Sequence, residues 1–260
     1  MLPISGNQFS MMPELSPLSF LVIFAALSLG GILKGATGAG TPIVAVPVMA
    51  AFFDVRLAVI IMATPNLVTN LWQVYQYRQH SLPDNFARNF AVAGAIGAVL
   101  GTAMLAMLPV RFLSLLLAFS VFAYVGLRIA SPSFRLEFEK AKKLVLPMGI
   151  GGGILQGAAG ISAPIAVSFL NAMRLERPVF IVTVSTFFSA MSVGQLPALY
   201  AYGLLNAQLL ALSAVSLIPM LGALPLGAYI AKRMSPRVFD LTILGLLTIL
   251  GFRLIYTALM

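Results

Sequence analysis

Residues 30–42 read GGILKGATGAGTP and directly follow LSPLSFLVIFAALSL, a run that is apolar enough to lie inside a lipid bilayer. Lys34 is the only charged residue between Glu14 and Asp54. A charged side chain deep in hydrocarbon costs roughly 2.5 to more than 10 kcal/mol, so it is expected to face a polar interior. The lysine and the glycines around it therefore indicate a functional site inside a membrane-embedded chain.

Composition places the whole chain in the same class. Of its 260 residues, 60% are hydrophobic and 9% are charged, and its mean hydropathy is +1.00. No ordinary soluble domain of this length buries so much apolar surface. Apolar segments long enough to cross ~30 Å of hydrocarbon as helices recur, without the alternating strands of an outer-membrane barrel. The sequence therefore predicts an all-α polytopic membrane protein.

The chain is internally duplicated. The stretch 31–38, GILKGATG, recurs at 153–160 as GILQGAAG, an offset of 153 − 31 = 122 residues. The same offset aligns Gln73 with Gln195. Each half reads as an apolar helix, a Gly-rich break, a short apolar helix and three longer spans. The helices are expected near 17–36, 41–53, 56–78, 87–108, 110–129, 144–160, 163–174, 177–201, 206–231 and 237–258.

The helix after each break is too short to span a bilayer comfortably, so we expect it to form a re-entrant hairpin with the helix before it. A hairpin and three crossing helices in each half give about eight membrane segments. An odd number of crossings inverts the second half relative to the first, as in many secondary transporters. We expect a first inverted repeat over 1–133, a cytoplasmic linker at 134–143 and a second inverted repeat over 144–260.

Positive charge follows this topology. Twelve basic residues fall on one membrane face and three on the other. The twelve are Arg78, Arg88, Arg128, Arg135, Lys140, Lys142, Lys143, Arg174, Arg177, Lys232, Arg233 and Arg237; the three are Arg56, Arg111 and Arg253. The positive-inside rule makes the first face cytoplasmic and both termini periplasmic. The basic charge is also compatible with anionic lipids, but its scatter among loops argues against nucleic-acid binding.

The breaks have the composition of anion sites. Gly38 and Gly40 let the backbone bend and expose amide groups, and the following helix is expected to start with Thr41 as N-cap and Pro42 at its first position. The second half repeats this with Gly160, Ser162 and Pro164. Gly35 and Gly157 are expected to help the bend. Two helix amino termini and the Lys34 ammonium would together attract an anion inside the membrane.

Two simpler readings of the break stay open. Lys34 could snorkel to the membrane interface instead of lining a cavity. The glycines could serve only close helix packing, although that reading suits Gly94, Gly97 and Gly101 better than a break followed by Thr-Pro. A nucleotide-binding loop is excluded, because the stretch follows no strand and lacks the Lys-Ser/Thr ending.

Polar residues also line one face of a helix in each half. The first stripe is Thr64, Asn66, Thr69, Asn70 and Gln73, and the second is Thr186, Ser189, Ser192 and Gln195. Such stripes line pathways or hold membrane helices together. The expected substrate-binding residues are Lys34, Thr37, Gly38, Gly40, Thr41, Thr64, Asn66, Asn70, Gln73, Gln156, Gly160, Ser162, Thr186, Ser189 and Gln195.

Enzyme chemistry has little support. Cysteine is absent and His80 is the only histidine, so disulfides and thiolate metal sites are excluded. Every Asp and Glu falls at an expected loop or helix end, so no catalytic, metal or cofactor site is predicted. A non-transporting subunit of a membrane complex remains an alternative, and the oligomeric state stays open.

The duplicated motifs LKGATGAGTP and LQGAAGISAP, with Thr64 and Gln73 on the following helix, resemble the TauE/SafE-type sulfite exporter family, also called TSUP or DUF81-like transporters. The resemblance covers nearly the whole chain. It implies a multi-pass exporter in the bacterial inner membrane, for a small anion such as sulfite, an organosulfonate or a short carboxylate. The residues do not choose among these anions, nor between proton coupling and uniport.

Overall fold

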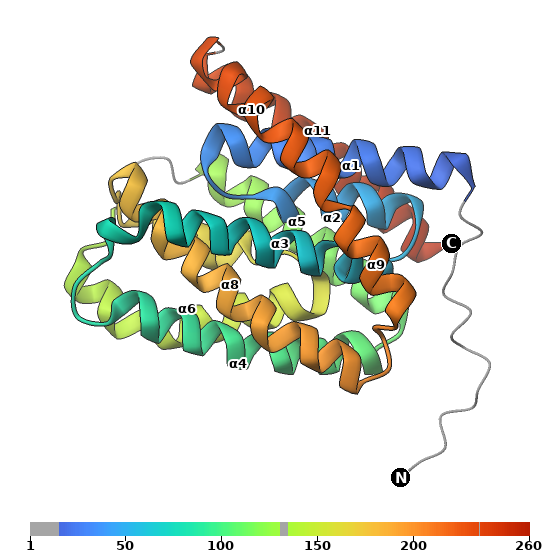
Figure 1. Ribbon diagram of the computed structural model, residues 1–260, viewed down its shortest axis with the longest axis horizontal. Helices are drawn as coiled ribbons and strands as arrows, with labels where there is room; N and C mark the ends of the chain where they lie inside the picture. Colours follow the sequence, from blue (N-terminus) through green and yellow to red (C-terminus); the bar gives the residue numbers. More distant parts are fainter. Residues whose placement is uncertain (1–15, 131–134, 234) are drawn as a thin grey trace.

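The computed structural model describes residues 16–130, 135–233 and 235–260, and its described elements are helices without any β-strand (Figure 1). Their order is α1 (Pro17–Thr37), α2 (Thr41–Phe52), α3 (Val55–Tyr77), η1 (Arg78–His80), α4 (Phe86–Met107), α5 (Val110–Ala130), α6 (Phe138–Ala159), η2 (Ala163–Val167), α7 (Ser168–Ala172), α8 (Arg177–Ala201), α9 (Ala207–Val215), α10 (Leu217–Arg233) and α11 (Pro236–Leu259). Among these residues seven segments are long and apolar enough to cross a membrane. The all-α polytopic class is confirmed.

Side-chain caps explain where several helices begin. The Ser16 hydroxyl accepts from the Ser19 amide at 3.2 Å before α1, and the Asp54 carboxylate accepts from the Leu57 amide at 2.8 Å before α3. Such caps satisfy amide groups that have no partner within the helix. Most expected boundaries were correct within a few residues. One long expected helix, 206–231, is instead divided at Ser216 into α9 and α10.

Glycine conformation produces both breaks. Gly38 and Gly40 have φ values of 85° and 98°, and Gly160 at the end of α6 has φ of 71°. This left-handed region is readily adopted only by glycine. The expected cap was wrong in detail: Gly40 is the N-cap of α2, and Thr41 is already helical.

Gly35 and Gly157 were expected to help bend the chain. This expectation is wrong, because both residues lie inside helices. A Cβ atom on Gly35 would lie 2.1 Å from the Leu224 carbonyl oxygen of α10, and one on Gly157 would lie 2.3 Å from the Ala98 carbonyl oxygen of α4. Glycine is needed at both places for backbone contact between membrane helices. The same packing role is confirmed for Gly97, which approaches the Ile150 carbonyl oxygen of α6.

The close contacts of the two halves are reciprocal. A Cβ atom on Gly38 would lie 2.6 Å from Ile181 in α8, and one on Gly160 would lie 2.9 Å from Val59 in α3. Both pairs obey the repeat offset, because 38 + 122 = 160 and 59 + 122 = 181. Likewise α1 packs on α10 as α6 packs on α4. We propose on this basis that 1–133 and 144–260 are the two repeats.

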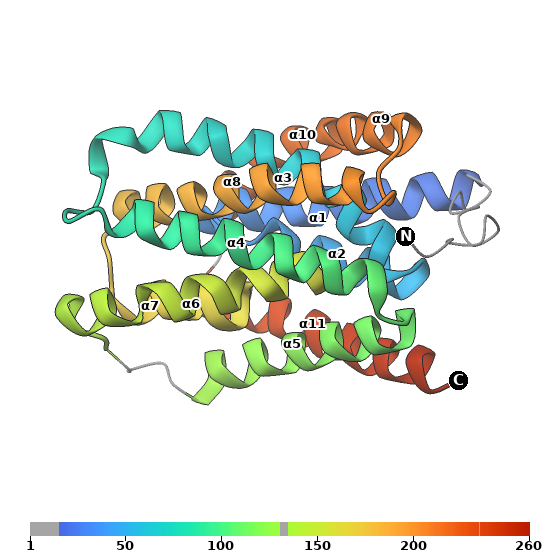
Figure 2. The ribbon, with the colours of Figure 1, turned by 90° about the horizontal axis from the view of Figure 1, so that it is seen from below.

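Equivalent helices run in opposite directions. Figure 2 shows α3 beside α8 and α5 beside α11, each pair antiparallel. The carboxyl ends of α3, α5 and α7 lie at the same end of the molecule as the beginnings of α4, α6 and α8 (Figure 2, left). We call this the basic end, because most of the basic residues are on these segments. The beginning of α1 and the end of α11 lie at the other end; residues 1–15 are outside the described part.

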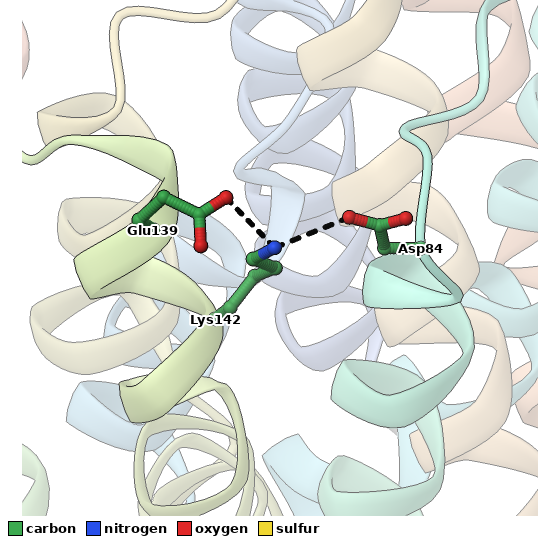
Figure 3. A network of polar contacts seen from close by, with 3 residues as sticks. All are labelled: Asp84, Glu139 and Lys142. Carbon is green, nitrogen blue, oxygen red and sulfur yellow. Dashed lines mark hydrogen bonds and ion pairs between the residues drawn. The ribbon is translucent and has the colours of Figure 1, made fainter.

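The expected linker at 134–143 is only partly a linker. Residue 134 lies outside the described residues, Leu136 donates its amide to the Ala172 carbonyl at 2.7 Å, and α6 begins at Phe138. On the first turns of α6, Lys142 contacts Glu139 at 2.7 Å and Asp84, before α4, at 3.2 Å (Figure 3). Hydrogen bonds to these carboxylates raise the pKa of Lys142. The charged start of α6 is thus fastened to the loop before α4.

The topology is testable by cysteine labelling, because the natural chain has no cysteine. Ser81→Cys lies at the basic end and Ala201→Cys at the opposite end, and both positions are exposed. In intact cells an impermeant maleimide should label Ala201→Cys but should label Ser81→Cys only after permeabilisation. The reverse pattern would overturn the predicted orientation.

The packing of α4 on α6 predicts a large effect of one methyl group. In Gly153→Ala the new Cβ would lie 2.2 Å from the Gly94 carbonyl oxygen, whereas a Cβ on Gly222 meets nothing within 4 Å. Overpacking typically costs about 1–3 kcal/mol, so Gly153→Ala should unfold at a clearly lower temperature than the wild type. Gly222→Ala is the matched control and should melt like the wild type. Equal melting of both variants would contradict the backbone contact.

Candidate functional site

Lys34 lies in the last turn of α1 and is held by a neutral amide. Its side chain is 3% exposed, and its ammonium donates to the Asn70 Oδ1 atom of α3 at 2.7 Å. Among the described residues no Asp or Glu forms an ion pair with it. The ammonium is therefore enclosed in the bundle without a counter-charge from the described part of the chain, and it does not snorkel.

A hydrogen-bonded chain continues from this lysine across three helices. Asn70 donates to the Asn66 Oδ1 atom at 2.9 Å, and Asn66 donates to the Ser192 hydroxyl of α8 at 3.1 Å. Ser192 in turn donates to the Phe188 carbonyl at 3.0 Å. The chain fixes the amide orientation of Asn70, so that its oxygen faces the ammonium. Three predicted site residues, Lys34, Asn66 and Asn70, are thus brought together.

Six other predicted site residues carry enclosed polar atoms that have no hydrogen-bond partner among the described residues. They are Thr41 Oγ1, Thr64 Oγ1, Gln156 Oε1, Ser162 Oγ, Ser189 Oγ and Gln195 Nε2. Leaving such a group unpaired costs about 1–3 kcal/mol, and native proteins rarely do so without a reason. The four hydroxyls and the Gln195 Nε2 atom can donate to water or to the oxygen atoms of a polar ligand, whereas the Gln156 Oε1 atom accepts and needs a donor such as water. They come from both halves of the chain.

Gln73 ties the first break to the second half. Its Nε2 atom donates to the Gly38 carbonyl at 2.9 Å, and its Oε1 atom accepts from the Ser185 hydroxyl at 3.0 Å. Because Gly38 ends α1, its carbonyl has no partner within the helix. Gln73 therefore supports the shape of the break. Ser185 was missed, because nothing in its local sequence distinguishes it from other membrane serines.

Two predicted site residues, Thr186 and Thr37, lie outside the hydrogen-bonded chain that runs from Lys34 to Ser192. Thr186 donates to the Val182 carbonyl of its own helix at 2.8 Å. Thr37 is exposed and donates to the Leu33 and Ala39 carbonyls at 2.8 and 2.5 Å. Thr37 lines a cavity that Lys34 does not line. Both hydroxyls satisfy nearby backbone carbonyls, as threonine commonly does in membrane helices.

Ser213 of α9 is a further polar contact that the sequence analysis missed. Its hydroxyl donates to the Ile61 carbonyl at 2.9 Å and accepts from the Thr64 amide at 3.1 Å. Pro65 follows Ile61 by four positions and has no amide hydrogen, so the Ile61 carbonyl lacks its helical partner. The signal available in sequence was this proline, which predicts that some other donor must approach α3.

The two breaks are equivalent in position but not in charge. Gln156 stands where Lys34 stands in the first half, since 34 + 122 = 156, and each is 3% exposed. The short helix after the second break also differs, because it begins with the π-helical turn η2. Ser162 precedes this turn without a capping hydrogen bond. The candidate site thus contains one ammonium and several neutral polar groups.

Removing the Asn70 side chain, which accepts the hydrogen bond from Lys34, should destabilise the fold. Asn70→Leu leaves the enclosed ammonium without its amide partner and should lower the free energy of unfolding by about 1–3 kcal/mol. In Lys34→Met/Asn70→Leu both partners are apolar, so the double variant should lose less stability than the sum of the single variants. Denaturant unfolding of the four purified proteins measures this coupling. Strictly additive losses would show that the two side chains do not interact.

Comparison with known proteins gives one family. A model of the family described as Sulfite exporter TauE/SafE matches residues 23–254. No curated protein and no solved structure matched the chain. The matched range contains both breaks, the Lys34 network and nearly all of the helices. The chain therefore belongs to the sulfite exporter TauE/SafE family of membrane transporters for sulfite or related anions.

Proposed function

We propose that this protein is a secondary transporter that binds a small anion beside Lys34, between the two Gly-rich breaks, and exports it across the bacterial inner membrane. The cargo is sulfite, an organosulfonate or a short carboxylate. The observation that carries the proposal is the enclosed Lys34 ammonium, whose partner is the neutral Asn70 amide. An enclosed charge is costly unless it is paired, and an anionic substrate supplies that pairing.

The neutral groups suit the oxygen atoms of such a substrate. Thr41 and Ser162 each carry a hydroxyl, and Gln195 carries an amide donor, with no partner among the described residues. Hydrogen bonds to an anionic acceptor are stronger than those between neutral groups. One ammonium and a few neutral donors favour an oxyanion of one or two charges over a larger polyanion.

Both alternatives lack comparable support. A membrane enzyme needs clustered acid, base or metal-binding groups, and the described residues contain no group of three His, Asp or Glu side chains that could hold a metal. A non-transporting subunit has no need for an enclosed lysine or for two equivalent breaks. Membership of a transporter family also favours transport.

The packing suggests which parts move together. The pairs α1/α10 and α4/α6 meet through backbone contacts at glycines, so each pair should behave as a rigid unit. The polar chain from Lys34 through Asn70 and Asn66 to Ser192 joins α1, α3 and α8. A bound anion would become a further partner of Lys34 and would join this hydrogen-bonded chain. We propose that the two glycine-packed pairs rock around the bound anion and expose it first to one side of the membrane and then to the other.

The decisive variant is Lys34→Met, which keeps side-chain length and removes the charge. In proteoliposomes with labelled sulfite it should reduce binding roughly ten- to a hundred-fold, since a charged hydrogen bond is worth about 1.5–3 kcal/mol. Lys34→Arg should recover only part of the affinity, because the planar guanidinium needs more room than an ammonium.

Lys143→Met is the matched control, because it removes an exposed lysine at the start of α6 and should transport normally. Wild-type transport by Lys34→Met would refute the role of the ammonium. If the wild type moves none of the candidate anions, the non-transporting subunit becomes the better reading.

A further inference from the structure

An ion pair joins the two halves of the chain at the basic end. The Arg128 guanidinium, in the last turn of α5, donates to the Asp240 Oδ2 atom near the start of α11 at 2.6 Å. The two side chains are 42% and 40% exposed, so the pair is partly open to solvent. Because α5 belongs to the first proposed repeat and α11 to the second, the pair is a contact between the repeats.

The ion pair lies beside two adjoining cavities. Their volumes are about 110 Å³ and about 290 Å³, and they share Thr37, Arg128, Asn171 and Phe180. Arg128 and Asp240 both line the smaller cavity, whereas Arg128 alone of the two lines the larger one. The ion pair is therefore at the boundary between the two cavities.

The smaller cavity reaches both Gly-rich breaks. It is lined by Leu33 and Ala39 at the first break, by Ile43 of α2 and by Val167 of η2, which follows the second break. None of these four residues lines the larger cavity, whose walls come mainly from residues 170–180 at the basic end. A passage from the basic end to the breaks would therefore cross the boundary that Arg128 lines.

Farther from the basic end, α5 and α11 meet through aromatic packing. The Phe122 and Phe252 rings lie edge to face with their centroids 5.1 Å apart, and a Cβ atom on Gly251 would lie 2.8 Å from the Phe122 ring. Among the described side chains, the Arg128–Asp240 pair is the only ion pair between these two helices. Separation of the pair would free the two helices at the basic end, while the aromatic contact acts as a pivot.

The equivalent arginine at the opposite end has a different partner. Residues 126–128, GLR, correspond to 251–253, GFR. Arg253 lies over the Phe52 ring, 4.1 Å from its centroid, and forms no ion pair with another described residue. Of these two arginines, only Arg128 has a carboxylate partner in the described part of the chain. That partner is at the end which the positive-inside rule predicts to be cytoplasmic.

We propose that the Arg128–Asp240 ion pair is a gate, which closes the smaller cavity towards the basic end and opens it when the pair separates. This inference rests on the proposed transport function, because a carrier opens its site to one side of the membrane at a time. A partly exposed ion pair contributes little to stability, so it can break and re-form as the repeats move. The gate is on the side from which an exporter takes up its anion.

Cysteine labelling measures the gate without any substrate. Val167 lines the smaller cavity and is 4% exposed, and Val167→Cys supplies the only thiol in the chain. N-ethylmaleimide is uncharged, so electrostatic attraction does not alter its reaction when a charge is removed. In the purified full-length protein, Asp240→Asn and Arg128→Gln should each raise the labelling rate about three- to fivefold, the factor by which such an ion pair shifts an equilibrium. The charge-swapped variant Arg128→Asp/Asp240→Arg should restore the slow rate.

Glu137→Gln is the matched control, because it breaks the exposed Glu137–Lys140 ion pair and changes no residue that lines either cavity. It should label as slowly as Val167→Cys alone. Melting temperatures identify the folded variants, and if the charge-swapped protein does not fold, the two single variants decide the test.

Labelling that neither single variant accelerates would overturn the gate. So would equally fast labelling of the control, or of a folded charge-swapped protein. Sulfite transport in proteoliposomes is measured separately. If the ion pair controls labelling but the wild type moves no sulfite, the gate is supported and the proposed cargo fails.

Discussion

The structure depends on the enclosure of the Lys34 ammonium in a bundle whose described residues supply no counter-charge. Lys34 is held by Asn70, which is oriented by Asn66, which reaches Ser192 on α8. Each of these links is neutral, so this hydrogen-bonded chain stabilises the ammonium through dipoles. In the proposed transport function, that arrangement leaves the charge available to an incoming anion, whereas a carboxylate partner would satisfy it permanently.

Glycine makes this enclosure possible in two separate ways. At Gly38, Gly40 and Gly160 it permits a left-handed backbone, so that α1 and α6 end inside the bundle. At Gly31 and Gly153 it permits backbone contact with α10 and α4. The contacts also repeat across the halves: Gly31 approaches the Met220 carbonyl oxygen as Gly153 approaches that of Gly94. A duplicated motif thus serves both the shape of the site and the rigidity of its walls.

Much of the helical fold was predictable from sequence, because hydropathy indicates the length of a membrane helix and glycines indicate where it ends. The enclosure of Lys34 in a polar interior was expected from the cost of charge in hydrocarbon. Its hydrogen bond to Asn70 of α3 is known only from the structure. The break was harder to read in detail. Gly35 and Gly157 look like bending residues but serve packing, and only the position of α10 and α4 reveals it. Single sequences do not give such long-range contacts.

The clustering of three arginines at the basic end was not predictable for the same reason. Arg128, Arg174 and Arg177 are separate juxtamembrane charges in the sequence, explained well enough by orientation in the membrane. Their meeting with Thr37 depends on how α5, α7 and α8 pack around the end of α1. Ser213 shows a related limit: Pro65 predicts a carbonyl in need of a donor, but not which helix provides it.

The central claim is that Lys34 binds the transported anion, and an anomalous-scattering experiment tests it most directly. Crystals soaked in selenite, the selenium analogue of sulfite, should show a selenium peak whose oxygen atoms lie within hydrogen-bond distance of the Lys34 ammonium, between the Gly38–Gly40 and Gly160 breaks. Occupancy at this place would identify the ammonium as the anion's partner. Selenium peaks confined to other parts of the protein, with Lys34 still bound only to Asn70 at saturating selenite, would contradict the account.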